Sequence, residues 1–538
     1  MTSASSDGHQ SDSPVLSLNG SADLRGGDRH SHIAIVGTGF SGIGAAIRFR
    51  KQGRDDFVVF EKANDVGGTW RDNTYPGIAC DVPSNLYSFS FALNPSWSRS
   101  YSPGAEIWNY LRKTAKKAGI LPFIRFNTEV TEARWNDDAQ IWHLQTSRGE
   151  HTADIVIGAL GPLSEPQIPA LPGIENFKGK MFHSAQWDHD YDLDGKRVAV
   201  VGTGASAIQF VPQIAKRVKQ LHLYQRTAPW VMPRSERKIT KLEHVLFRLF
   251  PPAQKAVRGG VYAMLEIRVV GFIKYPRTMK LVEQIARTHL KRQVPERELR
   301  EQVTPDYSIG CKRVLLANNY YPALRKPNVE VITHGVTEVR EGSIVGDDGV
   351  EREVDAIIWG TGFHVTRNPA WDHIIGREGH SLNEAWKDGM EAYVGSSVAG
   401  FPNLFLIVGP NTGLGHSSMV YMIESNIDYI ERVVEFIDKT GAASVDVKQQ
   451  TMHDYSRQIQ DEASKDTIWT TGGCASWYLD HRGRNTTLWP DFTFRFRRVC
   501  REFDPLTLNV RDRSGGAMLP QAAPAQAAQA RQSAPATA

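Results

Sequence analysis

Two glycine-rich segments, each set between an apolar strand and a helix, constrain the fold of this chain more than any other feature. The first is Gly37-Thr-Gly-Phe-Ser-Gly42, which follows the apolar run His32–Val36 and precedes a predicted helix over 43–52. The next predicted strand, Phe57–Phe60, ends at Glu61. This order is typical of a Rossmann-type unit, in which the glycines let backbone N–H groups approach a pyrophosphate and the acid accepts hydrogen bonds from ribose hydroxyls.

The second segment, Gly202-Thr-Gly-Ala-Ser-Ala207, follows the predicted strand Arg197–Val201. The strand after its helix, Leu221–Tyr224, ends in Gln225-Arg226 and carries no acid at that place. An arginine in that position suits the 2′-phosphate of NADPH. We therefore predict an α/β fold with two Rossmann-like dinucleotide-binding domains, the first for FAD and the second for NADP(H).

A chain of 538 residues is long enough for two to four domains. Residues 235–309 are rich in Lys and Arg, carry apolar residues at helical spacing and contain several prolines, which predicts a helical insertion. We interpret its basic faces as solvated, with contact to a membrane surface as the alternative. The predicted division is an FAD domain from 31–160 and 360–511, an NADP domain from 161–234 and 310–359, the insertion, and disordered tails at 1–30 and 512–538.

Composition narrows the classes of partner. The 63 basic and 59 acidic residues nearly balance, which gives no support for a nucleic-acid partner. The four cysteines form no CxxC pair, which fits a reducing cytosol and argues against a disulfide framework or a zinc site. No segment reaches the roughly 18 apolar residues of a membrane span, and no signal-like run follows Met1. We expect a cytoplasmic protein with no metal site.

Two further motifs lie outside the glycine-rich turns. The loop Gly67-Gly-Thr-Trp70 continues through Tyr75-Pro-Gly77 to Asp81, and the linker between the signatures reads Phe177-x-Gly179-x-x-x-His183-x-x-x-Trp187-Asp188. Together these motifs resemble those of type I Baeyer–Villiger monooxygenases, over about residues 32–510. The related flavin monooxygenases that oxidise nitrogen and sulfur usually carry Tyr or Phe where this chain has Trp187, so Trp187-Asp188 is the discriminating pair.

The resemblance assigns roles to individual positions. Those that match FAD contacts are Gly37, Gly39, Phe40, Ser41, Gly42, Glu61, Thr69, Trp70, Asp81, Tyr87 and Val130. Those that match NADP contacts are Gly202, Thr203, Gly204, Arg226, Thr227 and Lys312, and Trp477 matches a tryptophan on the nicotinamide side. Arg313 matches the active-site arginine with Asp81 as its carboxylate partner, whereas His183 and Trp187 match hinge residues. The segment Leu479–Asn485 departs from the family's usual loop, so the substrate preference of other members does not carry over.

The reaction implied by the resemblance uses both cofactors. NADPH would reduce FAD, O₂ would add to give a C4a-peroxyflavin, and this species would convert a small-molecule ketone to an ester or lactone. Arg313 would supply a fixed positive charge beside the developing oxyanion. The sequence leaves open which ketone is the substrate and what the oligomeric state is.

Three alternatives remain at this point. A flavin monooxygenase that oxidises nitrogen or sulfur is the nearest, and products from a ketone and a thioether would separate the two. An NADPH-dependent flavin reductase serving a protein partner would consume NADPH without oxygenating a substrate. A flavin-binding scaffold without catalysis has no need of the second nucleotide site, and a disulfide reductase would need a redox cysteine pair.

Overall fold

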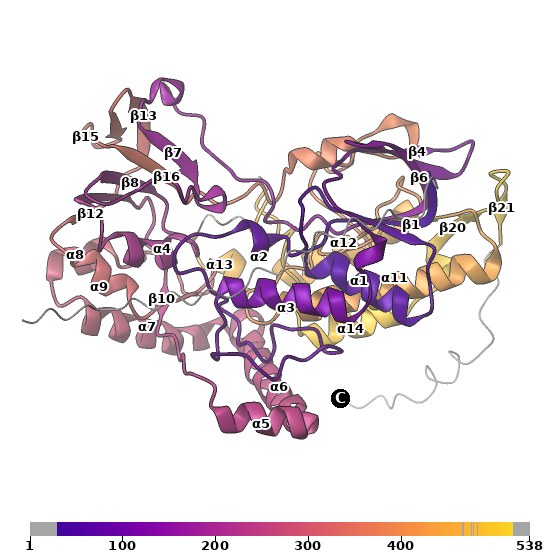
Figure 1. The fold of residues 1–538 in the computed structure, drawn as a ribbon, viewed down its shortest axis with the longest axis horizontal. Coiled ribbons are helices and arrows are strands. Elements are labelled where there is room, and N and C mark those ends of the chain that lie inside the picture. Colours follow the sequence, from indigo (N-terminus) through magenta and orange to yellow (C-terminus); the bar gives the residue numbers. More distant parts are fainter. Residues whose placement is uncertain (1–28, 465–466, 475, 477, 481, 520–538) are drawn as a thin grey trace, which may run out of the picture.

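Two lobes lie side by side in the computed structural model, one at each side of Figure 1, and each is built on its own mostly parallel sheet. The structure describes residues 29–464, 467–474, 476, 478–480 and 482–519. Parallel neighbours joined through helices are the pattern of dinucleotide-binding folds, so the predicted α/β class with two Rossmann-like units is confirmed.

The first sheet has the strand order β17-β4-β5-β6-β1-β2-β3, and β18 also pairs with β6. The antiparallel pairs in it are β4 with β5 and β5 with β6, which form a meander. Its strands are β1 (His30–Val36), β2 (Phe57–Phe60), β3 (Ile124–Arg125), β4 (Val130–Asn136), β5 (Ile141–Thr146), β6 (Gly149–Gly158), β17 (Ile374–Ile375) and β18 (Leu404–Leu406). The helices of this lobe are α1 (Phe40–Lys51), α2 (Thr69–Asp72), α3 (Gly104–Lys117), α10 (Leu382–Ala385), α11 (Met419–Thr440), α12 (Gln449–Ser464) and α14 (Thr493–Arg501). Helix α13 (Ile468–Thr471) packs instead with residues of the second lobe and of the predicted insertion, such as Trp230 and Phe272.

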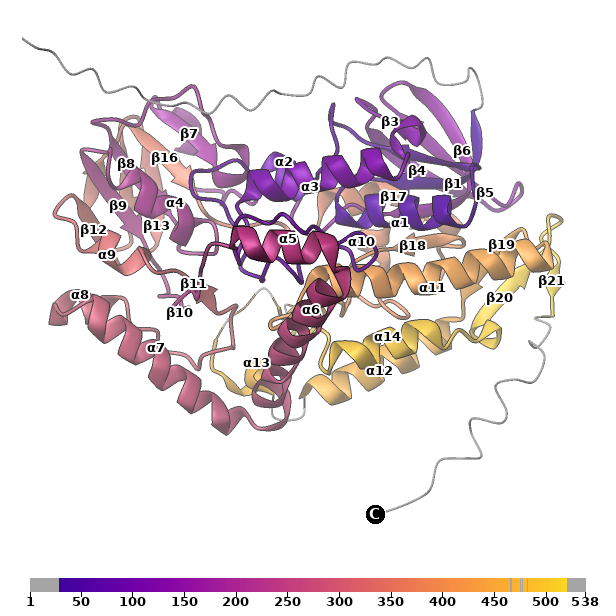
Figure 2. The same ribbon diagram turned by 60° about the horizontal axis from the view of Figure 1, so that its bottom comes forward.

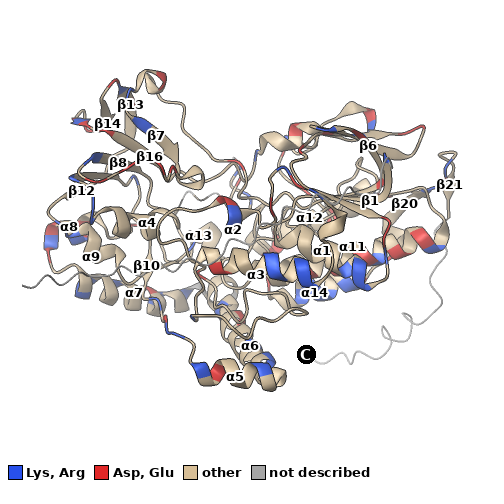
Figure 3. Cartoon of the chain, viewed as in Figure 1, with Lys and Arg blue, Asp and Glu red and all other residues tan. Residues whose placement is uncertain are grey.

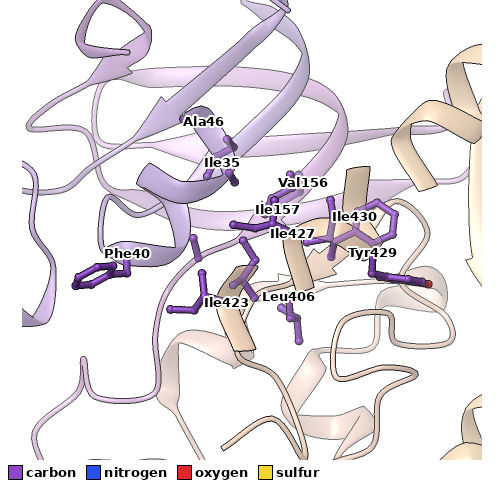
Figure 4. Packing of buried hydrophobic residues seen from close by; sticks show 14 of the residues in the cluster. Ile35, Phe40, Ala46, Val156, Ile157, Leu406, Ile423, Ile427, Tyr429 and Ile430 are labelled. Carbon is purple, nitrogen blue, oxygen red and sulfur yellow. The ribbon is translucent and has the colours of Figure 1, made fainter. Parts of the chain in front are cut away.

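The core of this lobe forms where β1 and β6 meet α1 and α11 (Figure 4). The apolar run of β1 is buried on both sides because helices cover a parallel sheet. Gly44 lets α1 approach α11 closely, since a Cβ there would lie 3.0 Å from the Cδ1 atom of Ile427. Each fully buried Ile side chain, such as Ile35 or Ile427, contributes about 1.5–3 kcal/mol.

The second sheet is all parallel, with the order β12-β9-β8-β16-β7. Its strands are β7 (Lys180–His183), β8 (Arg197–Val201), β9 (Gln220–Tyr224), β12 (Val329–Ile332) and β16 (Ala356–Trp359), and its helices are α4 (Ala207–Ile214) and α9 (Tyr320–Leu324). Smaller strands near it are β10 (Val231–Met232), β11 (Leu315–Leu316), β13 (Val336–Arg340), β14 (Ser343–Gly346) and β15 (Glu351–Glu353). The fingerprint linker therefore does not lie between the sheets, because its residues 180–183 form the edge strand β7 of the second.

The chain crosses between the lobes at 159–179 and returns at 360–373, and these two crossings pair with each other. The N–H of Gln167 donates to the Gly362 carbonyl, and the N–H of His364 donates to the Glu165 carbonyl, both at 2.9 Å. A bridge between Pro166 and Phe363 completes the contact. The lobes are thus joined by two paired strands of linker.

Four helices, α5 (Lys241–Leu249), α6 (Pro251–Glu266), α7 (Met279–Gln293) and α8 (Arg297–Gln302), occupy the segment predicted as a helical insertion. They follow β10 in the second lobe and come forward in Figure 2. Helix α6 also reaches the first lobe, where Glu266 accepts hydrogen bonds from the N–H of Thr493 (2.9 Å) and from its hydroxyl (2.7 Å). No helix among the described residues is long and apolar enough to cross a membrane.

The predicted tails need one correction. β21 (Ala517–Met518) pairs with β20 (Leu508–Arg511), which in turn pairs with β19 (Ser444–Val447). The carboxylate of Asp512 accepts the N–H groups of Ser514 and Gly516 at 2.9 Å and shapes the turn. The predicted start of the C-terminal tail at 512 is therefore wrong, because residues 512–519 form this turn and strand. The predicted N-terminal tail also ends too late, because β1 begins at His30. The disorder predicted for 1–28 and 520–538 lies outside the described residues.

The prediction that the cysteines form no disulfide also needs correction. The structure joins Cys311 to Cys474 in a disulfide, and Cys80 and Cys500 are free and buried. The two partners are 163 residues apart in the sequence, so no spacing motif could reveal the pair. The bond ties the segment that precedes Lys312 to the segment that follows α13.

We predict that the unfolded protein without reductant titrates two thiols, and four after reduction. Replacing Cys474 by Ser should lower the free energy of unfolding by about 2–4 kcal/mol, because the bond restricts a long loop in the unfolded chain. Thiol titration and urea unfolding check this, with reduced parent protein as the control. Four thiols without reductant would contradict the pairing.

Candidate active site

The first glycine-rich turn is a backbone cradle at the carboxyl end of β1. Gly37 has φ +107°, and a Cβ on it would lie 2.7 Å from the Ala159 carbonyl oxygen. A Cβ on Gly42 would lie 1.8 Å from the Gly37 carbonyl oxygen. Gly39 is the N-cap residue of α1, where no side chain caps the helix and no acid lies in the first turn. The N–H groups at this helix start can therefore meet the pyrophosphate of a dinucleotide such as FAD.

Glu61 lies beside this cradle and is already held by protein groups. Its carboxylate accepts the N–H of Thr38 (3.0 Å) and the Thr38 hydroxyl (2.5 Å) and pairs with Arg71 at 3.0 Å. These contacts fix a negative charge at the carboxyl end of β2, where ribose hydroxyls are bound in such folds. Arg71 was not among the predicted site residues, although it follows Trp70 in the quoted motif.

The remaining residues matched to FAD gather around the same turn. Trp70 in α2 donates its indole N–H to the Tyr87 hydroxyl at 3.1 Å, and Phe40 packs edge-on against Tyr87. The other matched positions are Ser41, buried in α1, Thr69, the first residue of α2, and Val130, the first residue of β4.

The second cradle repeats the first at the carboxyl end of β8. Gly202 has φ +106°, and a Cβ on it would lie 2.4 Å from the Gly360 carbonyl oxygen. Gly204 faces open space, and no side chain caps the start of α4. The Thr203 hydroxyl donates to the Thr227 carbonyl at 3.3 Å. This geometry fits a second dinucleotide.

Two cations lie near this second cradle. Arg226 is exposed just after β9, and Lys312 is half-buried with its Nζ atom 4.9 Å from the centre of the Tyr307 ring. Burial and the nearby charge of Arg226 together lower the pKa of Lys312. Repulsion between two cations is relieved when an anion binds between them. The pair therefore fits the additional phosphate of NADPH.

Asp81 and Arg313 form a two-point ion pair, the pairing expected from the sequence. The Nε atom of Arg313 donates to one carboxylate oxygen at 2.8 Å, and its Nη2 atom donates to the other at 2.7 Å. The charge of Asp81 raises the pKa of Arg313, so the guanidinium stays positive. Both side chains are only partly exposed, which keeps the charges close to the buried interior.

Three titratable side chains close to this ion pair are uncharged, and Arg234 lies nearby as a further arginine that donates to the Cys80 carbonyl at 3.3 Å. Burial raises the pKa of Tyr478 to about 12 and also raises the pKa values of Cys80 and Tyr87. Cys80 directly precedes Asp81, yet its thiol stays protonated and is a poor nucleophile. Arg313 therefore supplies a fixed positive charge beside these neutral groups.

The loop that carries Asp81 is docked on the second lobe through Gln209 of α4. The Gln209 side-chain oxygen accepts the Tyr75 hydroxyl (3.1 Å) and the Ala79 N–H (3.2 Å), and its amide nitrogen donates to the Ala79 carbonyl at 2.9 Å. Gly77 approaches the same helix, because a Cβ there would lie 2.7 Å from the Gln209 carbonyl oxygen. Sequence reasoning missed Gln209, which carries no motif of its own.

The fingerprint residues brace the second sheet beside this junction. A Cβ on Gly179 would lie 2.5 Å from the Asp355 carbonyl oxygen and 2.6 Å from the Phe177 ring, so the residue must be glycine. Asp188 pairs with Lys180 and accepts the N–H of Asp190 at 2.9 Å.

Trp187 packs between the ring of Phe182 in β7 and the ring of Phe210 in α4, with ring centroids 5.2 Å apart in each case. Phe210 also contacts the ring of Tyr75, 6.1 Å away, in the loop from the first lobe. Trp187 therefore supports the helix on which the Asp81 loop rests.

His183, the last residue of β7, is fully buried. Its Nδ1 atom accepts the N–H of Ala185 at 3.1 Å, and its ring packs edge-on against Phe363 in the return crossing. Burial lowers the pKa of His183 to about 4, although the Gly362 backbone nearby opposes the shift. The ring is thus neutral and structural at ordinary pH. Trp477, which was matched to a tryptophan on the nicotinamide side, lies outside the described residues.

Comparison with known proteins identifies the family. A family model described as flavin-binding monooxygenase-like matches residues 30–377, more than half of the chain. The chain belongs to this family. A Baeyer–Villiger monooxygenase of Streptomyces coelicolor is 50% identical over 476 residues, covering 88% of this chain and 92% of that protein. One of Pseudomonas aeruginosa is 52% identical over 478 residues, covering 88% and 90%.

Solved structures agree with this assignment. An oxidized steroid monooxygenase bound to NADP superimposes with a TM-score of 0.79 at 28% identity, covering 90% of this chain and 100% of that one. Cyclohexanone monooxygenase from Rhodococcus sp. Phi1 bound to NADP⁺ shares the fold, with a TM-score of 0.79 at 24% identity and the same coverage. This flavin-binding monooxygenase is therefore of the Baeyer–Villiger type.

The buried neutral ring of His183 should make the stability of this Baeyer–Villiger monooxygenase depend on pH. The ordinary pKa of His, near 6.5, applies to the unfolded chain, so below that value the unfolded chain binds a proton that the folded ring does not. Stability from the neutral ring is present above pH ~6.5 and is lost as the pH falls toward the folded pKa of about 4. The loss is at most about 3 kcal/mol.

We predict that His183→Gln reduces the slope of urea midpoint against pH in this window. His151, whose pKa burial also lowers to about 4, maintains part of the slope in the variant. Replacing the exposed His143 by Gln is the matched control. An unchanged slope in His183→Gln would show that this ring is not buried as a neutral group.

Proposed function

We propose that the enzyme inserts one atom of O₂ beside the carbonyl of a small-molecule ketone and gives an ester or a lactone. The observation that carries this proposal is the ion pair of Asp81 with Arg313, held between two nucleotide cradles. When bound, FAD accepts hydride from NADPH and activates O₂ for transfer to the substrate. The second oxygen atom leaves as water, so one NADPH and one O₂ are consumed for each ester.

Arg313 is proposed as the catalytic cation. Attack on a ketone carbonyl places negative charge on its oxygen, and a fixed guanidinium stabilises that charge more than mobile water can. Asp81 uses two oxygens to hold Nε and Nη2 of Arg313, which leaves Nη1 free of that carboxylate. Asp81 is thus proposed to orient the guanidinium, and the buried side chains around the pair keep water away.

The cofactor roles follow from the two cradles. We propose that the turn at Gly37–Gly42 with Glu61 holds the FAD pyrophosphate and ribose, and that the turn at Gly202–Ala207 holds NADPH with its 2′-phosphate on Arg226 and Lys312. This proposal is supported by the contacts of Glu61 with Thr38 and of Thr203 with Thr227 beside these two turns. We place the enzyme in the cytoplasm, because its reductant NADPH is intracellular.

A product assay with labelled O₂ tests the reaction. Purified enzyme with NADPH receives a panel of linear, cyclic and aromatic ketones and, in parallel, a thioether. Ester or lactone carrying one labelled oxygen supports the proposal. Sulfoxide without ester from any ketone would favour a heteroatom oxidase, and NADPH consumption without oxygenated product would favour a flavin reductase.

We predict that Arg226→Ala weakens NADPH binding about tenfold to a hundredfold and spares NADH, since one charge-assisted phosphate contact contributes about 1.5–3 kcal/mol. The KM values of both coenzymes check this. Arg217→Ala removes an exposed arginine on the same lobe, which pairs with Asp194 and Asp192, and is the matched control. Equal weakening of NADPH and NADH in Arg226→Ala would remove the phosphate role.

We predict that Arg313→Ala loses ester formation by about a hundredfold to a thousandfold, as removal of one preorganised donor does elsewhere, while the protein keeps its FAD. Arg313→Lys should recover little, because one ammonium cannot hold both oxygens of Asp81 and also face the substrate. Product yield per NADPH and bound flavin are measured together. An Arg313→Ala variant that forms ester at the parent rate would exclude Arg313 as the catalytic cation.

A further inference from the structure

Helix α5 presents a row of large apolar side chains to solvent. Leu242 and Leu249 are 78% and 80% exposed, and Val245, Leu246 and the following Phe250 are also exposed. Positions 242, 245, 246 and 249 have the i, i+3, i+4, i+7 spacing that places side chains on one face of a helix. We name these four residues with Phe250 the α5 stripe. Soluble proteins rarely leave such a continuous face uncovered.

The stripe is exposed because the opposite face of α5 is fixed to the protein. Phe247 is buried, the Nε2 atom of His244 donates to the Trp97 carbonyl at 2.9 Å, and Arg248 donates to the Ser96 hydroxyl at 2.9 Å. Thr240 and Glu243 form a capping box at the start of the helix. The helix therefore cannot rotate its stripe inward without losing all of these contacts.

Exposed apolar side chains are concentrated in this part of the molecule. Among the described residues, 17 large hydrophobic side chains are exposed, and 11 of them lie between Leu242 and Ile285. Met264 and Ile267 belong to this set at the end of α6, and Leu281 and Ile285 follow one turn apart on α7. The concentration argues for one interaction surface rather than for scattered exposure.

The surroundings of the stripe are strongly basic. Residues 237–282 contain ten Lys or Arg and two acids, Glu243 and Glu266, which gives a net charge of +8. Glu243 pairs with Arg237 through hydrogen bonds of 2.6 and 2.9 Å, and Glu266 is buried, so the other basic side chains of this segment meet no exposed acid within it. In Figure 3, the ribbon of α5 is coloured blue at its Lys and Arg residues. The partner should therefore combine negative charge with an apolar interior.

We propose that the α5 stripe and its flanking bases bind the surface of an anionic phospholipid bilayer. The apolar side chains would enter the region below the headgroups while Lys238 and Lys241 meet lipid phosphates, the arrangement of interfacial amphipathic helices. A second copy of the chain fits less well. A two-fold contact through the stripe places the same basic residues of both copies against each other.

The test measures flotation of the flavin-loaded enzyme with vesicles of phosphatidylcholine alone or with about 30% phosphatidylglycerol. Binding is expected to the anionic vesicles and to fall when salt is raised to about 0.5 M. The variant Leu246→Glu/Leu249→Glu should lose binding by at least about tenfold, because two charges then enter the apolar region. Leu506→Glu/Val350→Glu changes two exposed apolar residues elsewhere and should bind like the parent.

A second variant, Lys238→Glu/Lys241→Glu, keeps the stripe and should bind anionic vesicles weakly with little response to salt. Flavin content and melting temperature of every variant are compared with the parent. Parent enzyme that does not float with anionic vesicles overturns the proposal. So does equal flotation of the stripe variant, or a parent dimer by light scattering that the stripe variant converts to monomer without any vesicle binding.

Discussion

The ion pair of Asp81 with Arg313 is the contact on which the rest of the site depends, because its two charges come from different lobes. Asp81 ends a loop of the first lobe, and Arg313 precedes β11 in the second. Pairing through two hydrogen bonds fixes the orientation of the Arg313 guanidinium as well as its distance from the Asp81 carboxylate. A partly exposed ion pair contributes little to the stability of the whole protein. Its role is therefore to position the guanidinium of Arg313 and not to hold the lobes together. The lobes must be held together by other contacts.

Gln209 and the paired crossings supply that hold. Gln209 satisfies two polar backbone groups of Ala79, two residues before Asp81, and its helix begins directly after the second glycine-rich turn. A shift of the second nucleotide turn would therefore also move Gln209, the residue that binds the Asp81 loop. This gives the fingerprint a physical role. Trp187 packs against Phe210, the residue of α4 that follows Gln209, so its ring helps to keep the helix at the position where Gln209 reaches Ala79.

The sequence predicted the features that local chemistry determines. Positive φ and close backbone approach leave only glycine at Gly37 and Gly202, so both turns could be read from the chain. Contacts between distant residues gave no such signal. Cys311 and Cys474 are 163 residues apart, and neither Gln209 nor Arg71 lies in a pattern that names its partner. The resemblance supplied the pairing of Asp81 with Arg313, which spacing alone could not.

Helix α6 connects the exposed α5 to the buried interior of the first lobe. At its end, burial alone would raise the pKa of Glu266, but the nearby His416 ring and hydrogen bonds from Thr493 lower it, so the carboxylate is charged. His416 lies 3.4 Å away in the loop before α11, and Thr493 starts α14. Earlier along α6, Arg258 donates to the carbonyls of Leu86 and Ser88. Moving α6 would break these contacts together and leave a buried charge unpaired, which costs several kcal/mol. Helix α6 is therefore fixed rigidly to the FAD lobe, and α5 has a fixed orientation relative to the site.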